Sequence, residues 1–260
     1  SKKGADALCA LTTSQATVEE AYLLQKLTRE VGSNNIDFRQ NQVDFSNQNS
    51  LGVLPGINCE ISDLDNSDMV FVIGSNMRQE QPVLHLRVRK AWYQNSANIC
   101  ILNPADYDYR MDLAENLLVN IDELPQVFAQ IISVVLKSVK VEPKSELADL
   151  KAKFKDHFSE VKPNKNAKNI AKLLLDAENP VILSGEIAAN HVQASLILNL
   201  QNLLIKLLNA KGGRLTQGPN AAGISVAGAL PHLGTAGKIL KTSGLDADKI
   251  LQDADKKVFI

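Results

Sequence analysis

Cysteine, aromatic side chains and long apolar runs are all scarce in this chain of 260 residues. The three cysteines, Cys9, Cys59 and Cys100, lie too far apart for the CxxC spacing of metal and redox sites, and an odd number cannot pair into a disulfide framework. We therefore interpret them as free thiols in a reducing compartment. Because an iron–sulfur cluster needs several clustered thiolates, we expect none in this chain.

The usual catalytic and metal-binding motifs are also missing. The four histidines, His85, His157, His191 and His232, form no HxxxH or HExxH pair, and no serine lies in a G-x-S-x-G elbow. The sequence therefore predicts no catalytic residue and no metal ligand.

Neither charge nor hydropathy indicates a nucleic-acid or membrane protein. The 28 Lys and Arg residues are balanced by 29 Asp and Glu residues, so the basic excess that phosphate-backbone binding requires is absent. No apolar run approaches the roughly 18 residues that span a bilayer, and residues 1–6 lack the apolar core of a signal peptide. We expect no nucleic-acid partner, no direct membrane insertion, and a cytosolic or matrix-facing protein. The chain lacks an initiator methionine and ends on an apolar run, so we also expect a fragment of a longer protein.

What the sequence does contain is an alternation of apolar strands with helical patterns. The predicted strands lie at 7–11, 69–73, 98–102, 116–119 and 179–185, with a last one at the end of the chain. The predicted helices lie at about 17–32, 82–93, 122–138, 191–208 and 246–252. Further helices are predicted in a lysine-rich part, one on the spacing of Leu147, Leu150 and Phe154. This alternation indicates an α/β fold with parallel sheets.

Local signals place some boundaries in this pattern. Thr17 and Glu20 form a T-x-x-E capping box, and Gly32 suits the end of the same helix. The Asn-, Gln- and Ser-rich residues 33–58 predict a long surface excursion, and residues 212–237 predict a glycine-rich loop. We predict a first α/β unit at 1–142, a helical connection at 143–178 and a second α/β unit at 179–260.

Two segments could bind a ligand. Gly74, Ser75 and Asn76 follow a buried strand, at the place where doubly wound sheets bind phosphate with free N–H groups. However, GxGxxG is absent and the next strand ends in Asn103 rather than a ribose-binding carboxylate, so a structural turn is the alternative. In the second segment, 212–223, Arg214 could meet an anion, or the glycines could pack tightly against the sheet. We interpret Glu80 as a first-turn charge that favours its helix dipole.

Three stretches of the chain contain recognisable motifs: residues 19–39, residues 62–91 with Gly74-Ser75-Asn76 and Glu80-Gln81-Pro82, and residues 218–231 with Gly218-Pro219-Asn220. These stretches resemble the molybdopterin oxidoreductase superfamily. Together the likeness covers most of residues 5–235. Within the superfamily, the chain is most similar to the C-terminal part of the large iron–sulfur subunit of the NADH:quinone oxidoreductases, respiratory complex I.

The resemblance implies a fold and a cofactor site that no longer binds its cofactor. It implies parallel-sheet, Rossmann-like layers of the formate dehydrogenase and DMSO reductase type. The iron–sulfur clusters of such a subunit would lie upstream, since nothing here matches its cysteine-rich segments. Where catalytic relatives continue with an Arg-Leu-Cys-His type segment, residues 39–44 contain neither Cys nor His, which argues against a molybdenum ligand. Gly74, Ser75 and Asn76 align with the loop that cradles a pterin dinucleotide, so with Arg214 they would be a vestigial cofactor site.

The function implied by the resemblance is structural. We expect a non-catalytic scaffold portion of a peripheral-arm subunit that supports electron transfer from NADH to quinone, without a cofactor of its own. It would contact other peripheral-arm subunits of complex I on the cytoplasmic face of a bacterial inner membrane or on the mitochondrial matrix side. The alternative is a fragment of a molybdopterin-dinucleotide-dependent oxidoreductase. A third interpretation takes residues 178–185 as resembling the central domain of thiamine-diphosphate enzymes.

Overall fold

The chain folds into two compact units, each built on a parallel sheet. A computed structural model describes residues 4, 7–48, 55–139, 148–149, 152, 158, 161–216, 218–252 and 258–259. Unit 1 comprises Ser1–Gly56, Asn190–Ser195 and Thr216–Ile260, and unit 2 comprises Ile57–Ala189 and Leu196–Leu215. The predicted α/β fold with parallel sheets is confirmed.

Unit 2 is built on a five-stranded parallel sheet with the strand order β5-β4-β3-β6-β7. Its strands are β3 (Met69–Ile73), β4 (Asn98–Asn103), β5 (Glu115–Leu118), β6 (Pro180–Ser184) and β7 (Lys211–Arg214). Every residue of β3 and β6 is buried. Such continuous apolar burial is typical of central strands that are covered on both faces.

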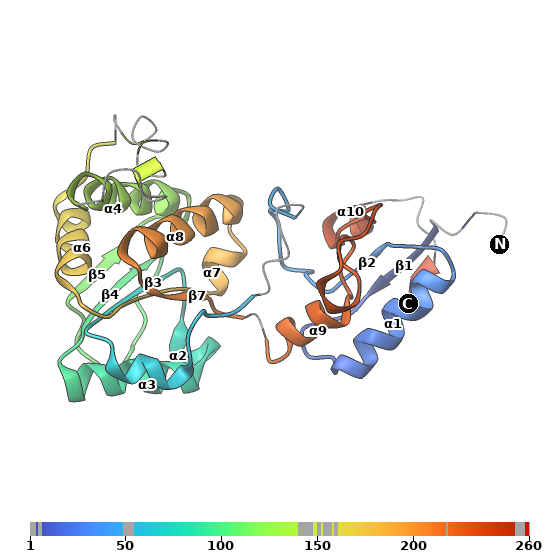
Figure 1. Ribbon diagram of the computed structural model, residues 1–260, viewed down its shortest axis with the longest axis horizontal. Helices are drawn as coiled ribbons and strands as arrows, with labels where there is room; N and C mark the ends of the chain where they lie inside the picture. Colours follow the sequence, from blue (N-terminus) through green and yellow to red (C-terminus); the bar gives the residue numbers. More distant parts are fainter. Residues whose placement is uncertain are drawn as a thin grey trace. The chain divides into compact units, whose positions relative to one another are not determined.

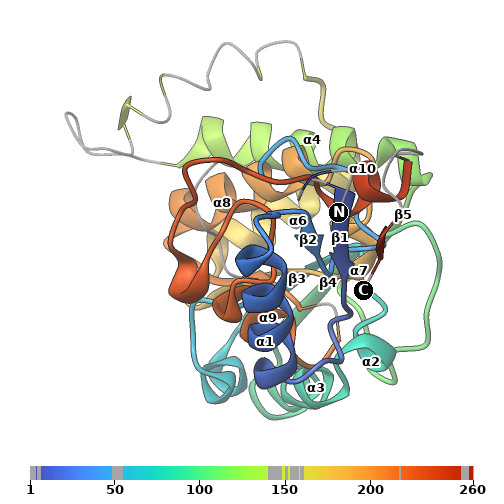
Figure 2. The same ribbon diagram turned by 90° about the vertical axis from the view of Figure 1, so that its right-hand side faces the viewer.

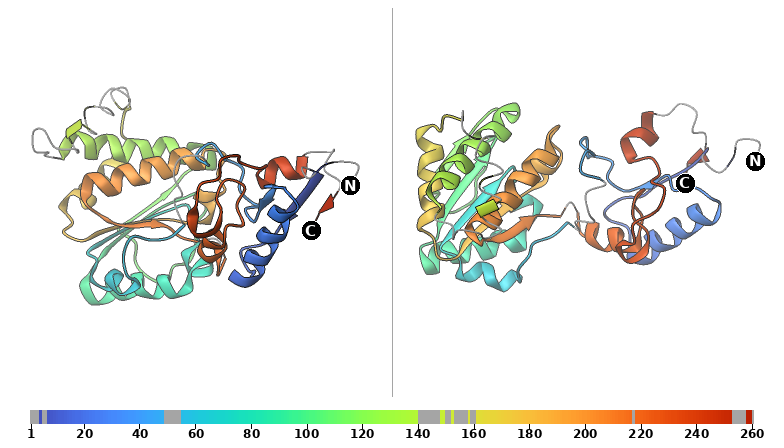
Figure 3. Two further views of the ribbon diagram at one scale, coloured as in Figure 1. Left: turned by 45° about the vertical axis from the view of Figure 1, so that its right-hand side comes forward. Right: turned by 45° about the horizontal axis from the view of Figure 1, so that its top comes forward.

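Helices cover both faces of this sheet (Figures 1 and 3). They are α2 (Met77–Glu80), α3 (Pro82–Asn95), α4 (Leu124–Ser138), α6 (Lys165–Asp176), α7 (Glu186–Ala189) and α8 (Ala194–Leu208). Short 3₁₀ turns lie at Ile61–Asn66 and Ile121–Glu123. On one face α4, α6 and α8 share an apolar core. In this core the rings of Phe71 and Phe128 pack edge to face, with their centroids 5.9 Å apart. On the other face α3 packs through Val88 and Ala91.

Unit 1 has a smaller parallel sheet with the order β2-β1-β8. Its strands are β1 (Leu8–Leu11), β2 (Ile36–Asp37) and β8 (Val258–Phe259), and its helices are α1 (Val18–Glu30), α9 (Ala221–Ala227) and α10 (Ala247–Gln252), with a 3₁₀ turn at Thr235–Gly237. Helices α1 and α9 pack side by side (Figure 2). The predicted capping box is present, since Thr17 Oγ1 accepts from Glu20 N at 3.2 Å and Glu20 Oε2 accepts from Thr17 N at 2.8 Å.

Two segments predicted as loops contain regular structure. The surface excursion predicted at 33–58 is wrong where it begins, because β2 pairs with β1 and both of its residues are buried. The glycine loop predicted at 212–237 contains most of β7 and all of α9. Gly212 has φ +133°, and a Cβ there would overlap the carbonyl oxygen of Ile182. The glycine therefore lets a strand without apolar side chains lie close against β6.

The sheet of unit 2 crosses the boundary predicted at 179. Strand β6 pairs with β3 along its whole length, from Met69 opposite Pro180 to Ile73 opposite Ser184. The compact units therefore have other bounds than the predicted ranges 1–142, 143–178 and 179–260. Leu147, Leu150 and Phe154, on which a helix was predicted, lie outside the described residues. Within the described part of the chain, the helices are all too short or too polar to cross a membrane.

Candidate functional site

The residues predicted to bind a ligand all lie at the carboxyl ends of strands in the unit 2 sheet. Ile73 pairs with Leu102 on one side and with Ser184 on the other, and Ser184 pairs with Arg214. Gly74, Ser75 and Asn76 therefore follow the carboxyl end of β3, on the same side of the sheet as the carboxyl end of β7. Arg214 is the last residue of β7, and strand β6 separates it from β3.

Gly74 makes the turn at the end of β3 and has no room for a side chain. Its φ is +56°, a conformation that L-residues rarely adopt. A Cβ on Gly74 would lie 2.6 Å from the backbone nitrogen of Ala188, and that nitrogen donates to Gly74 O at 3.1 Å. The close approach that a glycine permits is thus used by α7 of the same chain.

Ser75 is fully buried, and its backbone is held by two side chains. Its N–H donates to Asn103 Oδ1 at 2.8 Å, and its carbonyl accepts from Asn103 Nδ2 at 2.8 Å and from the Tyr109 hydroxyl at 2.7 Å. Burial, with the nearby Tyr107 and Glu80, raises the pKa of Tyr109, so its hydroxyl stays a neutral donor. Asn103 therefore holds the loop, and its amide is not directed at a ribose.

Glu80 is the polar centre of this loop. Its Oε1 accepts from the backbone N–H of Asn76 at 2.6 Å. Its Oε2 accepts from the Ser75 hydroxyl at 2.8 Å and from the backbone N–H of Glu186 at 2.9 Å. Burial, and then the charge of Glu80, raise the pKa of Glu186. The carboxylate thus joins the end of β3 to the start of α7.

The function of Glu80 is more specific than that of a first-turn charge, as we interpreted it from the sequence. The short helix α2 was not predicted, and it brings Glu80 back over the loop that precedes it. The sequence signal was the position of Glu80 four residues after Asn76, because one helical turn brings residues at that spacing together. Contact with Glu186, 106 residues further along, has no such local signal.

These contacts occupy the backbone donors with which the loop could hold a phosphate group. A phosphate at a strand end is held by free backbone N–H groups. Here the N–H groups of Ser75, Asn76 and Glu186 donate to side-chain oxygens of the same chain. A Cβ on Gly185 would overlap Ser75 and lie 2.6 Å from Glu80 Oε2, so Gly185 packs directly against the loop. The negative carboxylate would repel a bound anion.

The second glycine segment is organised by Gln201 of α8. Its Nε2 donates to Ile182 O at 3.1 Å and to Gly213 O at 2.8 Å, and its Oε1 accepts from the Ser184 hydroxyl at 2.7 Å. Gly213 lies inside β7. The two glycines therefore pack within the sheet, and Arg214 is the last residue of the strand.

In unit 1, a buried ion pair holds the segment after β2. Arg39 donates from Nε to Asp37 Oδ1 at 2.8 Å and from Nη2 to Asp37 Oδ2 at 2.7 Å, and the Asp37 side chain is fully buried. Arg39 Nη2 also donates to Gln48 Oε1 at 2.8 Å.

Among the residues that the structure describes, no group of three or more His, Cys, Asp or Glu side chains is placed to hold a metal ion.

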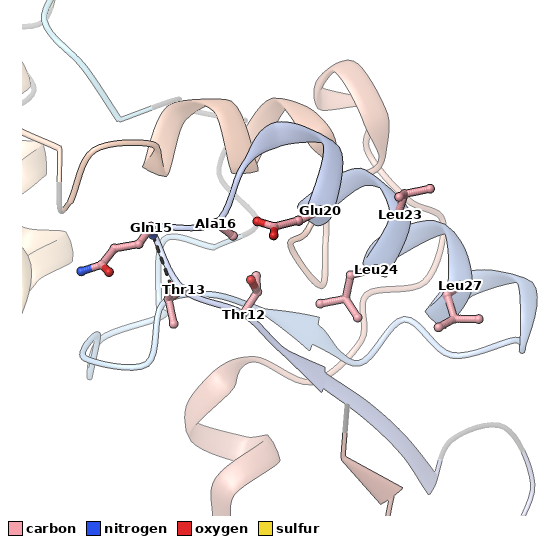
Figure 4. Close-up of a pocket in the computed structure, with 8 residues that line it drawn as sticks. All are labelled: Thr12, Thr13, Gln15, Ala16, Glu20, Leu23, Leu24 and Leu27. Carbon is pink, nitrogen blue, oxygen red and sulfur yellow. Dashed lines mark hydrogen bonds between the residues drawn. The ribbon is translucent and has the colours of Figure 1, made fainter.

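Unit 1 also has a shallow groove beside α1. It has a volume of about 690 Å³ and is lined by the turn after β1 and by one side of the helix. The lining residues are Thr12, Thr13, Gln15, Ala16, Glu20, Leu23, Leu24 and Leu27 (Figure 4). Leu23 and Leu27 are 63% and 49% exposed, so the groove wall on the helix is apolar and open to solvent.

Comparison with known sequences identifies the family. The sequence profile of the molybdopterin oxidoreductase family matches residues 1–256, and the chain belongs to this family. It is 38% identical over 93 residues to "Probable oxidoreductase YjgC" of Bacillus subtilis, and 36% identical over 94 residues to a "Putative formate dehydrogenase" of Staphylococcus aureus. These matches cover 34% and 35% of this chain but 9% and 10% of the relatives, so the chain spans about a tenth of their length.

Solved structures share the fold at low sequence identity. A formyltransferase/hydrolase complex from Methylorubrum extorquens has a TM-score of 0.59 at 13% identity, over 94% of this chain and 65% of that chain. Acetylene hydratase from Pelobacter acetylenicus has a TM-score of 0.57 at 16% identity, over 78% of this chain and 30% of that one. The comparisons support the superfamily predicted from the sequence, and they do not point specifically to the large subunit of complex I.

The family implies a pterin dinucleotide, and its phosphates can be tested against this loop. The donors that would hold them, at Ser75, Asn76 and Glu186, are bonded within the chain. The described residues at the carboxyl end of β3 therefore do not fit the cofactor.

Proposed function

We propose that this chain is a scaffold portion of an oxidoreductase of the molybdopterin family, in which the loop after β3 joins parts of the protein and holds no cofactor. The observation that supports this proposal is the internal bonding of the loop. The side chain of Asn103 accepts a hydrogen bond from the N–H of Ser75, and the Glu80 carboxylate accepts hydrogen bonds from the N–H groups of Asn76 and Glu186. Because these N–H groups already donate within the chain, the loop is held rigidly and the same groups are not free to bind a phosphate.

The particular oxidoreductase we propose is NADH:quinone oxidoreductase. The segments Gly74-Ser75-Asn76 and Glu80-Gln81-Pro82 resemble its large iron–sulfur subunit. In that setting, electrons would pass through iron–sulfur clusters in other parts of the subunit. This portion would support the clusters and contact neighbouring peripheral-arm subunits, on the cytoplasmic face of a bacterial membrane or on the matrix side in mitochondria.

A second candidate is favoured by the names of the relatives. One relative is named a formate dehydrogenase and another an oxidoreductase. In this alternative, the longer protein would hold a molybdopterin dinucleotide, and the loop after β3 would have to open before binding it.

Metal and pterin analysis separates the two candidates. The gene product is produced in a host that makes molybdenum cofactor, and molybdenum and pterin are measured per mole of pure protein. We expect neither above the level of a preparation in which the gene is omitted. Stoichiometric molybdenum together with pterin would overturn the scaffold proposal in favour of the second candidate. A complex I role further requires that the protein co-purify with NADH:quinone oxidoreductase activity, and its absence from such a complex would contradict that assignment.

A further inference from the structure

Three donors from two separate segments converge on the Glu80 carboxylate. The hydroxyl of Ser75 and the N–H of Asn76 come from the loop after β3, and the N–H of Glu186 comes from the start of α7. The three distances lie between 2.6 and 2.9 Å, as is typical of hydrogen bonds to a charged acceptor.

The charge of Glu80 is balanced mainly by neutral donors. Among the described residues, no lysine or arginine forms an ion pair with this carboxylate. Backbone N–H groups and a hydroxyl surround it instead, which is how proteins commonly hold a phosphate oxygen at a strand end. The partly buried carboxylate therefore has the surroundings of a bound oxyanion.

We infer that Glu80 is a built-in substitute for an oxyanion, a positioning residue that occupies the donors of the loop and thereby excludes phosphate ligands from it. This inference rests on the proposed scaffold function and names the residue responsible. It differs from a simple capping role in one respect. If Glu80 only stabilises α2, its removal costs stability and nothing more. If it replaces an oxyanion, its removal leaves donors that an added oxyanion can use.

The test uses the 260-residue chain and inorganic pyrophosphate as the probe. Binding is followed by the NMR shifts of the Asn76 and Glu186 amides in the wild-type chain and in Glu80→Ala. Wild type is expected to show no saturable shift at about 10 mM pyrophosphate, and Glu80→Ala is expected to bind at least about tenfold more tightly. Gln79→Ala is the matched control, because Gln79 is the exposed neighbour of Glu80, and it should behave as wild type. Glu80→Gln keeps the volume of the side chain without its charge, and we expect a smaller gain in pyrophosphate affinity than for Glu80→Ala.

Either of two results would overturn the inference. One is a folded Glu80→Ala chain whose two amides do not respond to pyrophosphate. The other is a wild-type chain that binds pyrophosphate at these amides as tightly as the variant does. If Glu80→Ala does not fold in plain buffer, refolding is compared in pyrophosphate and in sodium chloride of equal ionic strength. Recovery in pyrophosphate alone supports the inference, and recovery in neither or in both contradicts it.

The outcome is separable from that of the proposed function. Molybdenum and pterin analysis of the wild-type protein tests the scaffold role. A cofactor-free wild type combined with an unresponsive Glu80→Ala would leave the scaffold role standing and remove Glu80 as its cause.

Discussion

Asn103, at the end of β4, and Ser75, after β3, exchange two hydrogen bonds, each 2.8 Å long, through one side-chain amide. The amide presents an acceptor to the Ser75 N–H and a donor to its carbonyl, which a carboxylate cannot do. Since both residues are fully buried, no water replaces either bond. The residue type at 103 is therefore set by the neighbouring backbone.

Asn103→Asp should destabilise the protein although the side chain keeps its size. The aspartate would lose the bond to the carbonyl of Ser75 and bury a charge, at a cost of about 2–4 kcal/mol. Denaturant unfolding followed by the fluorescence of the single tryptophan, Trp92 in unit 2, measures this change. Asn98→Asp, at the exposed start of the same strand, is the control and should change stability by less than about 1 kcal/mol. Equal effects of the two substitutions would show that the amide at 103 has no special importance.

Gly74→Ala should be more costly than alanine at another glycine with positive φ. Gly74 and Gly237 have φ of +56° and +74°, but a Cβ would meet Ala188 at the first and nothing within 4 Å at the second. Gly237→Ala should cost about 1–2 kcal/mol from backbone strain alone. Gly74→Ala should add about 1–3 kcal/mol, because α7 has to move. Unfolding followed by circular dichroism compares them, and a Gly237 variant at least as unstable as the Gly74 variant would contradict this account.

Low pH should lower the free energy of unfolding of unit 1 through the protonation of His232. Burial, together with the charge of Arg39, lowers the pKa of His232 from 6.5 to about 4. The unfolded chain therefore binds a proton below pH 6.5 that the folded chain does not bind until about pH 4. Stability should fall as the pH drops through this window, and less steeply in His232→Gln. Unfolding curves at several pH values measure the two slopes, and parallel slopes would exclude His232 as the cause.

Nucleotides should not bind to the wild-type chain. Because the donors of the loop after β3 are occupied, guanine nucleotides and NADH should show no saturable binding up to about 1 mM, which corresponds to an affinity weaker than about −4 kcal/mol. Calorimetry or ligand-observed NMR tests this. Saturable micromolar binding that is abolished by substitution of Gly74 or Arg214 would favour a true cofactor site.

The sequence predicted those parts of the fold whose signals are local. The apolar run at 69–73, the Thr17–Glu20 capping box and the proline at position 82 each depend on neighbouring residues, and the structure confirms them as β3, the start of α1 and the first residue of α3. Strand β7 was missed because Lys-Gly-Gly-Arg has no apolar pattern. Its pairing with β6 depends on a close backbone approach that no local pattern contains.

The candidate site was located from the sequence, but its chemistry was not. The rule that ligands bind at carboxyl ends of strands led to Gly74, Ser75 and Asn76, and these residues do leave the sheet at that edge. Whether their donors are free depends on Glu80 and Asn103, which arrive from α2 and β4. The sequence alone cannot answer this question, because the hydrogen-bond partner of a polar residue depends on the three-dimensional fold.

The segment at Ile57 and Asn58 covers the outer edge of β7 at its two glycines. Asn58 donates its N–H to Gly212 O at 2.9 Å and accepts the N–H of Gly212 on Oδ1 at 2.8 Å. Ile57 forms an antiparallel bridge with Gly213. An exposed glycine-rich edge would otherwise be a template for strand addition by a second molecule and for aggregation. This short segment therefore occupies the edge of β7 at Gly212 and Gly213, where a strand of a second molecule would otherwise pair.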